Sequence, residues 1–279
     1  MSVPIASLTG HLGDAVATRL REWDRDRGTA RLWAKDASLW TGGDEARWLG
    51  WLDAAWHQRA ALGAYRALQA DLQNRVSDVV VLGMGGSSLC PFVLASSVGA
   101  QAGWPRLHVL DSTDPVQIAG LESRLDLPRT RFIVASKSGS TLEPNLMRDY
   151  FLDRVRDGTR FIAITDPGSQ LEQQAQAAGF GSIFRGEPEI GGRFSALSPF
   201  GMVPAAAMGL NVEILLSRAD AAAQACRAEP AGDNPGVVLG ITLGTAAEQG
   251  RDKLTLIASP GIAELGAWLE QLVAESTGK

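Results

Sequence analysis

Residues 79–90 read VVVLGMGGSSLC and decide the fold. A run of β-branched residues breaks abruptly into glycine and serine, which is typical of a buried strand whose backbone approaches a ligand at its end. Similar runs follow at 107–112, 131–137 and 160–166, with a shorter one at 182–186, and helical patterns lie between them. Strands that alternate with helices predict βαβ units, so we expect an α/β fold with a parallel sheet flanked by helices.

The composition indicates a globular protein, since 45% of the 279 residues are hydrophobic and 20% are charged. The formal charge of −5 gives no reason to expect nucleic acid as a partner. Cys90 and Cys226 lie far apart without metal-ligand spacing, which favours reduced thiols and a cytoplasmic location. The first 16 residues lack a signal-peptide pattern, and no apolar run reaches roughly 18 residues. We expect no membrane partner, no metal and no cofactor.

The chain divides into three segments by pattern. Residues 1–75 place apolar side chains at helical spacing and predict a helical N-terminal segment, whereas residues 76–210 predict the first α/β domain. Residues 211–279 continue a helical pattern that starts at residue 204, then show a strand pattern at 253–260 and a last helical pattern. One strand cannot form a sheet, so we expect the start of a second, incomplete α/β domain in a fragment of a longer enzyme.

Most of the tryptophans lie in the helical N-terminal segment. Tryptophan spaced along amphipathic helices is usually core, so we expect these side chains to pack a helical layer and not to form an aromatic binding site. They are Trp23, Trp33, Trp40, Trp48, Trp51 and Trp56.

Two nucleotide-binding patterns fail at the loop that follows the first strand. A dinucleotide fingerprint needs glycine where Ser88 stands, and a phosphate-binding Walker loop needs a lysine that is missing. Asp111 could contact a ribose, but the residues after it resemble a helix cap at Asp114 followed by Pro115.

The loop after the third predicted strand carries four hydroxyl side chains in six residues, SKSGST at 136–141. Hydroxyls and free N–H groups at a helix N-terminus can bind an anion, yet serine-rich sequences also serve as plain helix caps. The loop alone leaves both readings open. Because GGSS ends a neighbouring strand, we favour a phosphate site suited to a sugar phosphate monoester.

Four motifs in order resemble the phosphoglucose isomerase family. GMGGSSLCP at 83–91 and SKSGSTLEP at 136–144 are similar to its Gly-Gly-Ser signature and its phosphate loop. GGRFS at 191–195 matches its Gly-Gly-Arg-[Phe/Tyr]-Ser motif. LVAESTGK at 272–279 resembles the Gly-Glu-Ser-x-Gly-Lys motif that holds the catalytic glutamate of short bacterial isomerases, and Glu275 stands at that position. The amino-acid sequence is most similar to the isomerase part of transaldolase/phosphoglucose isomerase fusions, including the stretches RLWAKDASLW, LHVLDSTDP and KLTLIASPGI.

The resemblance implies two sugar-isomerase (SIS) domains and a phosphate site in the first. Ser136, Ser138 and Thr141 would hold the substrate phosphate, with Lys137 adding its backbone and its charge. Gly86 and Ser87 would face the sugar, because small residues let the backbone come close.

The resemblance also implies aldose–ketose isomerisation of glucose 6-phosphate and fructose 6-phosphate through a cis-enediol. Glu275 would move a proton between C1 and C2, and Arg193 would stabilise the negative charge of the enediolate. Without the other motifs, we would read Arg193 as a surface arginine in a turn and Glu275 as a solvated carboxylate near a helix end.

The chain departs from the family pattern in its histidines. The family opens the sugar ring with a histidine and a lysine carried later in the chain, and His11, His57 and His108 match neither motif nor position. His108 lies inside a predicted strand, where we expect a packed imidazole. Two functions follow: the isomerase portion of a longer, homodimeric enzyme such as a transaldolase fusion, or a sugar-phosphate-binding module without catalysis.

Overall fold

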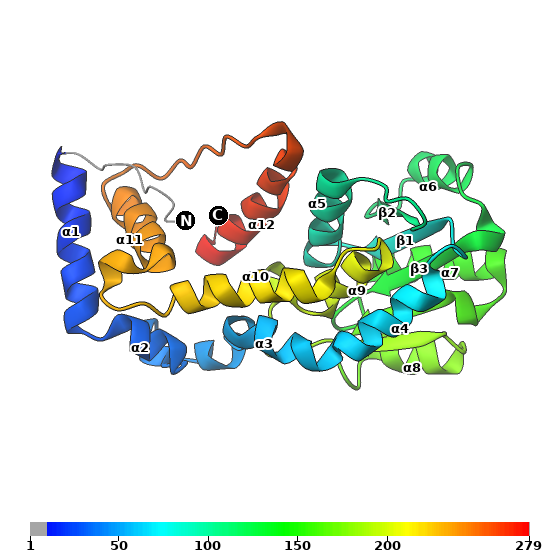
Figure 1. The fold of residues 1–279 in the computed structure, drawn as a ribbon, viewed down its shortest axis with the longest axis horizontal. Helices are drawn as coiled ribbons and strands as arrows, with labels where there is room; N and C mark the ends of the chain where they lie inside the picture. Colours follow the sequence, from blue (N-terminus) through cyan, green and yellow to red (C-terminus); the bar gives the residue numbers. More distant parts are fainter. Residues whose placement is uncertain (1–9, 279) are drawn as a thin grey trace. The chain divides into compact units, whose positions relative to one another are not determined.

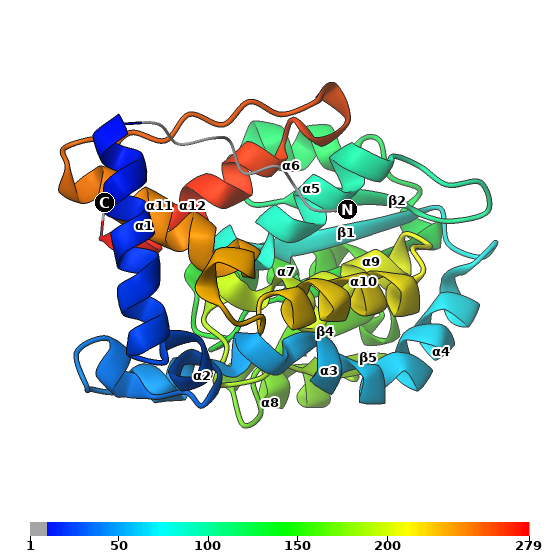
Figure 2. The ribbon, with the colours of Figure 1, turned by 60° about the vertical axis from the view of Figure 1, so that its left-hand side comes forward.

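The computed structural model describes residues 10–278, which include a five-stranded sheet. All strand pairs are parallel, and the order is β2-β1-β3-β4-β5; Figure 2 shows β2 beside β1, with β4 and β5 further along the sheet. The strands are β1 (Asp78–Gly83), β2 (Arg106–Leu110), β3 (Thr130–Ala135), β4 (Phe161–Thr165) and β5 (Ser182–Arg185). The predicted α/β fold, with its parallel sheet flanked by helices, is therefore confirmed.

By their contacts, the residues form two compact units, which are described separately. The larger unit, Asp53–Leu216 with Ile257–Lys279, holds the sheet. Its helices are α3 (Ala54–Gln58), α4 (Leu62–Leu72), α5 (Leu89–Val98), α6 (Pro115–Glu122), α7 (Leu142–Val155), α8 (Gln170–Ala177), α9 (Pro199–Ala207) and α12 (Leu265–Thr277), all labelled in Figure 1. Two 3-10 turns matter for the site, η5 (Gly85–Ser87) and η8 (Gly192–Leu197).

The central strands of the sheet, β1, β3 and β4, are buried on both faces. Val79, Val80, Val81 and Leu82 of β1 are all fully buried, which explains why the strand reads as a continuous apolar run. One face packs against α6, α7 and α8. The ring of Phe132 is stacked there between two others: its centroid lies 4.7 Å from that of Phe151 and 4.9 Å from that of Phe161. Fully buried residues of α4 and α9 supply the rest of the core.

The smaller unit, Met1–Leu52 with Ser217–Leu256, is helical in its described part. It includes α1 (Gly10–Arg25), α2 (Gly28–Trp33) and α11 (Pro235–Glu248), and α10 (Val212–Ala225) enters it from the larger unit. Polar contacts between distant parts of the chain hold it: Asp24 accepts the N–H of Ala231 at 2.8 Å, and Trp33 Nε1 donates to the Cys226 carbonyl at 3.0 Å.

Three local expectations are wrong. Residues 251–259 form no strand and are exposed, because an apolar run becomes a strand only beside a partner whose N–H and C=O groups pair with it. The helix expected from residue 204 breaks at Gly209, whose φ of 89° favours glycine and ends α9. The helical pattern at residues 45–73 predicts a continuous helix, but the structure divides it into short 3-10 turns, α3 and α4. Gly50, a poor helix former, lies in this divided stretch.

The expectation of a tryptophan core is wrong for three of the six side chains. Trp40, Trp48 and Trp56 are 47%, 42% and 65% exposed. Trp48 ends a short 3-10 turn and Trp40 follows another, and such turns present too small a face to cover an indole. The Arg59 guanidinium lies 5.8 Å from the centroid of the Trp56 ring. Within residues 10–278, no helix combines the length and the apolar character needed to cross a membrane.

Candidate active site at the carboxyl edge of the sheet

The loops after β1 and β3 lie side by side, because these strands are neighbours in the sheet. Gly83, the last residue of β1, pairs with Ala135, the last residue of β3. A Cβ on Gly83 would stand 3.0 Å from Ser87 Cβ and 3.2 Å from the Ala135 carbonyl oxygen. The Gly-Gly-Ser turn and the hydroxyl loop therefore meet at one edge, where parallel sheets hold their ligands.

The hydroxyl loop, residues 136–141, is a tight turn before α7. Ser136 is buried, and its hydroxyl accepts the N–H of Gly139 at 3.2 Å. Gly139 has φ 71°, and a Cβ there would stand 2.2 Å from the backbone nitrogen of Leu171, so only glycine fits. Ser138 and Ser140 share a hydrogen bond of 2.8 Å. The loop thus gathers its hydroxyls into one small turn.

Thr141 stands at the N-cap position of α7, but its side chain makes no capping hydrogen bond. The plain helix-cap reading of this loop therefore fails at the residue that should do the capping. Its Oγ1 lies 3.5 Å from Ser136 Oγ, at the limit of a hydrogen bond. Thr141 thus gives no side-chain cap to the N–H groups of Leu142 and Glu143, and Pro144 has no N–H; uncapped N–H groups at a helix N-terminus are suited to an anion.

Lys137 points away from the hydroxyls. Its ammonium forms an ion pair with Asp166, which follows β4, and donates to the carbonyls of Glu187 at 3.4 Å and Pro188 at 3.1 Å. The charge expected to help hold a phosphate is thus engaged by a carboxylate of the same molecule.

The two glycine motifs pack backbone against backbone. A Cβ on Gly86 would stand 2.2 Å from the Gly192 carbonyl oxygen, which requires glycine at this position. The buried Ser195 donates its hydroxyl to the carbonyls of Gly192 at 2.7 Å and Gly86 at 3.2 Å. The motif at 191–195 is therefore held directly against the turn that contains Ser87.

Arg193 and Glu275 come together at this edge although 82 positions separate them in the sequence (275 − 193). Arg193 Nη1 lies 3.7 Å from Glu275 Oε2, and Arg193 Nε donates to Ser276 Oγ at 2.8 Å. The two charged side chains are 30% and 48% exposed, so both remain accessible to a small ligand. The Arg193 guanidinium also lies over the Phe194 ring, 4.7 Å from its centroid.

Sequence reasoning missed Gln271 and Ser276, which orient this pair. Gln271 Nε2 donates to Glu275 Oε1 at 2.8 Å, and the Gln271 amide lies 2.8 Å from the Cβ position of Gly85. Gln271 precedes Glu275 by four residues, a spacing that places both on one face of a helix, so the signal was present in the sequence.

Other reactive groups of the larger unit have structural surroundings. Burial raises the pKa of the Cys90 thiol to about 12, which leaves it protonated and unreactive. His108 Nε2 lies 2.8 Å from Asp78 Oδ1, so this imidazole is packed against a buried carboxylate, as expected for a strand position. In the described part of the chain, no group of three or more His, Cys, Asp or Glu side chains could hold a metal ion.

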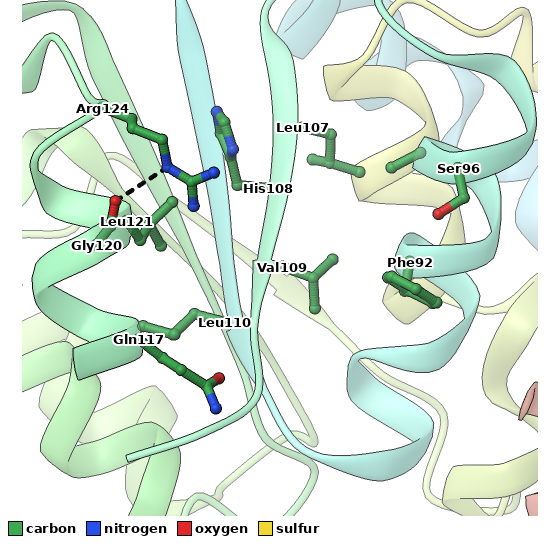
Figure 3. Close-up of a pocket in the computed structure, with 11 residues that line it drawn as sticks. Phe92, Ser96, Leu107, His108, Val109, Leu110, Gln117, Gly120, Leu121 and Arg124 are labelled. Atoms are coloured by element: carbon green, nitrogen blue, oxygen red, sulfur yellow. Dashed lines mark hydrogen bonds between the residues drawn. The ribbon is translucent and has the colours of Figure 1, made fainter. Parts of the chain in front are cut away.

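A hollow of about 540 Å³ lies elsewhere, between α5 and α6 along the edge strand β2. Figure 3 shows Arg124 bonded to the Gly120 carbonyl, a contact of 2.9 Å. His108 on the same wall contacts Asp78. None of the residues expected to bind substrate lines this hollow, and its Arg124 and His108 side chains already have partners within the protein.

A parallel sheet with a hydroxyl-rich loop and a glycine-rich turn at its carboxyl edge defines the class: an α/β protein with an open parallel sheet, a fold in which ligands bind at the strand ends. The family model described as phosphoglucose isomerase matches residues 59–279. The chain therefore belongs to the phosphoglucose isomerase family.

Relatives and solved structures agree with this family. The chain is 34% identical over 216 residues to a glucose-6-phosphate isomerase of Synechococcus sp. (strain JA-3-3Ab), a match covering 74% of this chain and 40% of that protein. It is 31% identical to the enzyme of Rubrobacter xylanophilus, covering 80% and 54%. A crystal structure of a glucose-6-phosphate isomerase from Chlamydia trachomatis matches with a TM-score of 0.66 at 27% identity, covering 90% of this chain and 48% of that one.

A hypothetical protein from Thermus thermophilus, known from its crystal structure, is similar over 96% of this chain and 64% of its own, with a TM-score of 0.81 and 28% identity. The chain spans about 40% of the length of several curated relatives that it matches.

Proposed function

We propose that this chain is the part of a glucose-6-phosphate isomerase that binds the sugar phosphate and carries the catalytic base. The observation that supports this most is the meeting of Arg193, Glu275 and Ser276 beside the glycine turns, since it puts a carboxylate and a guanidinium next to a phosphate-type loop. The names of the relatives supply the substrate, glucose 6-phosphate.

In this proposal the hydroxyl loop takes the phosphate. Ser136, Ser138 and Thr141 would donate hydroxyl hydrogen bonds, and the uncapped N-terminus of α7 would add N–H groups and its dipole. Gly86 and Ser87 would lie along the sugar, where the absence of a large side chain lets the backbone approach. The phosphate would thereby fix the distance between the loop and the reacting carbons.

The reaction needs one proton to move between adjacent carbons. The Glu275 carboxylate would take the proton from C2 of the open-chain aldose, and the electron pair left behind would form the cis-enediolate. The same carboxyl would return the proton to C1 while the hydroxyl proton on O2 moves to O1 and the C2=O bond forms, which gives the ketose. Arg193 would stabilise the enediolate oxygen, because a guanidinium stays charged throughout the cycle.

A coupled assay of fructose 6-phosphate turnover, on this chain and on a longer form of the protein, tests the proposal. In whichever form is active, Glu275→Gln should lower turnover by roughly 10²–10⁴-fold, because the amide cannot take a proton. Calorimetry should show nearly unchanged binding of the sugar phosphate. Full turnover in Glu275→Gln would place the base elsewhere.

The second candidate function is a sugar-phosphate-binding module without catalysis. It is favoured by α12, none of whose residues is buried, since a catalytic base normally needs a firmly positioned support. Binding of fructose 6-phosphate without turnover in both forms of the protein would select this candidate.

Three wider features belong to the same proposal. We infer a homodimer in the cytoplasm, and a parent protein that includes a transaldolase part, on the resemblance of RLWAKDASLW and KLTLIASPGI to such fusions. Light scattering gives the oligomeric state, and the mass of the protein in its native cells, with an assay for transaldolase activity, tests the fusion.

A further inference from the structure

The Lys137–Asp166 ion pair is the strongest polar feature near the candidate site that the proposed chemistry does not use. Lys137 comes from the loop after β3, and Asp166 comes directly after β4. The two side chains are 28% and 18% exposed, so both are largely shielded from water. Such a pair is retained at the cost of desolvating two charges, and its position next to the hydroxyl loop calls for an explanation.

The lysine ammonium has no donor left for a ligand. An ammonium group carries three N–H donors, and Lys137 Nζ has three acceptors within the chain: the Asp166 carboxylate and the carbonyls of Glu187 and Pro188. The carbonyls lie in the loop after β5. A phosphate could be reached by this ammonium only if one of these bonds were broken.

The same lysine is tied to β4 through its backbone. Its carbonyl accepts the N–H of Asp166 at 3.0 Å and the hydroxyl of Thr165 at 3.2 Å. A Cβ on Gly186 would stand 2.7 Å from Asp166 Oδ1, so the chain passes tightly over this carboxylate. Backbone and side chain of Lys137 therefore join the loops after β3, β4 and β5.

The loop after β5 is anchored in turn to α3 and α4. Glu187 Oε1 accepts from Gln58 Nε2 at 2.6 Å, and Glu187 Oε2 lies 3.2 Å from His57 Nδ1. The buried Tyr65 donates its hydroxyl to Gln58. Lys137 thus connects the hydroxyl loop, through the loop after β5, to α3 and α4.

We infer that Lys137 is a positioning residue, which holds the backbone of residues 136–141 through Asp166 and does not itself contact the substrate phosphate. This inference rests on the proposed function, because it assigns a role within the proposed phosphate site. It makes Asp166, which no sequence motif indicated, as important to phosphate binding as Lys137.

The test uses three variants of the full chain: Lys137→Met, Asp166→Asn and the double variant. Calorimetry with fructose 6-phosphate and with inorganic phosphate should show that both single variants bind about 10-fold more weakly, the scale of one lost charge-assisted hydrogen bond. Since both changes break one contact, the double variant should lose no more than about twofold beyond Lys137→Met. Lys253→Met, at a 90% exposed lysine, is the control for loss of one positive charge and should bind like the unaltered chain.

The opposite result is equally clear. If Lys137 contacted phosphate directly, Asp166→Asn would free its charge and tighten binding, whereas Lys137→Met alone would weaken it. Tighter binding by Asp166→Asn overturns the inference.

Hydrogen exchange separates this inference from the proposed function. In the absence of ligand, residues 136–141 should exchange faster in Lys137→Met and in Asp166→Asn, with exchange of β1 unchanged. If the unaltered chain binds neither phosphate nor fructose 6-phosphate, the proposed function fails, and the exchange data still decide the positioning role. Unchanged exchange in this loop in both variants overturns it.

Discussion

The hydroxyl loop and helix α12 carry the two halves of the proposed site and are supported in different ways. The loop continues from β3, whose residues Phe132, Ile133 and Val134 are fully buried, and it is closed around Gly139. Helix α12 has no buried residue, and its polar contacts to the rest of the site come from Arg193, which donates to Ser276 and lies 3.7 Å from Glu275. The proposed phosphate site would therefore be supported by the core, whereas the proposed base lies on a helix without buried residues.

This difference in support predicts how the hydroxyl loop and α12 each respond to a substitution. Damage to the loop must disturb the sheet, because the loop backbone packs directly on neighbouring loops. Damage to α12 should be local, because none of its residues is buried.

Hydrogen exchange should show the largest contrast. The amides of α12 should exchange through local opening, whereas those of β1 and β3 should exchange only on global unfolding, because their strands are buried and paired on both sides. Mass spectrometry of peptides from the unaltered chain makes the comparison directly. Equal protection in both regions would show that α12 unfolds with the sheet and would remove the contrast.

Gly139→Ala should produce the largest loss of stability among the substitutions. The new Cβ would meet the Leu171 backbone nitrogen at 2.2 Å, and alanine is strained at φ 71°. Overpacking and strain together predict a loss of about 3 kcal/mol in the free energy of unfolding, measured in urea. Gly120→Ala in α6 is the control, because open space surrounds that position and a helix gains about 0.5–1 kcal/mol from the change. Equal stability of the two variants would contradict the tight packing of the loop.

Acid should weaken the sheet through Asp78 at the start of β1. Burial opposes the charge of this carboxylate, but bonds from His108 and Ser77 and the charge of Arg106 outweigh burial and hold its pKa below the ordinary 3.8. A lowered pKa in the folded state means that the stabilisation is present above about pH 4 and is lost as the pH falls through the folded value.

Asp78→Asn tests this acid dependence. The variant should lose about 2 kcal/mol of stability at pH 7, because charge-assisted hydrogen bonds are lost. The difference from the unaltered chain should shrink towards pH 3, as measured by urea unfolding at both pH values. A difference that is the same at both pH values would show that the charge of Asp78 contributes nothing.

The central strands β1, β3 and β4 were predictable from sequence because each is buried on both faces. A fully buried parallel strand reads as an apolar run, and this is why β1 and β3 were found at nearly their observed positions. The run at 253–260 also contains several apolar residues but forms no strand, because pairing depends on a neighbour that a composition pattern does not reveal.

The candidate site was predictable only where its residues follow strands or form motifs. Ser136 and Gly86 were indicated by their places after strands, and the closeness of Arg193 to Glu275 rested on the family resemblance. Asp166 was missed because its ion pair with Lys137 exists only once β4 lies beside β3. Such a contact belongs to the tertiary structure and leaves no local pattern.

The smallest expected effect tests the other side of the comparison, the docking of α12. Ser276→Ala removes the hydroxyl that accepts from Arg193 Nε, and water can partly replace it because Arg193 is 30% exposed. We expect a loss of about 0.5–1 kcal/mol confined to α12, so that its amides exchange faster while the urea midpoint of the sheet stays unchanged. Thr277→Ala is the matched control, since that hydroxyl bonds only within the helix, to the Val273 carbonyl at 2.8 Å. If both variants raise amide exchange in α12 equally, the Arg193–Ser276 hydrogen bond does not hold the helix. Arg193 would then lie beside Glu275 without support from Ser276.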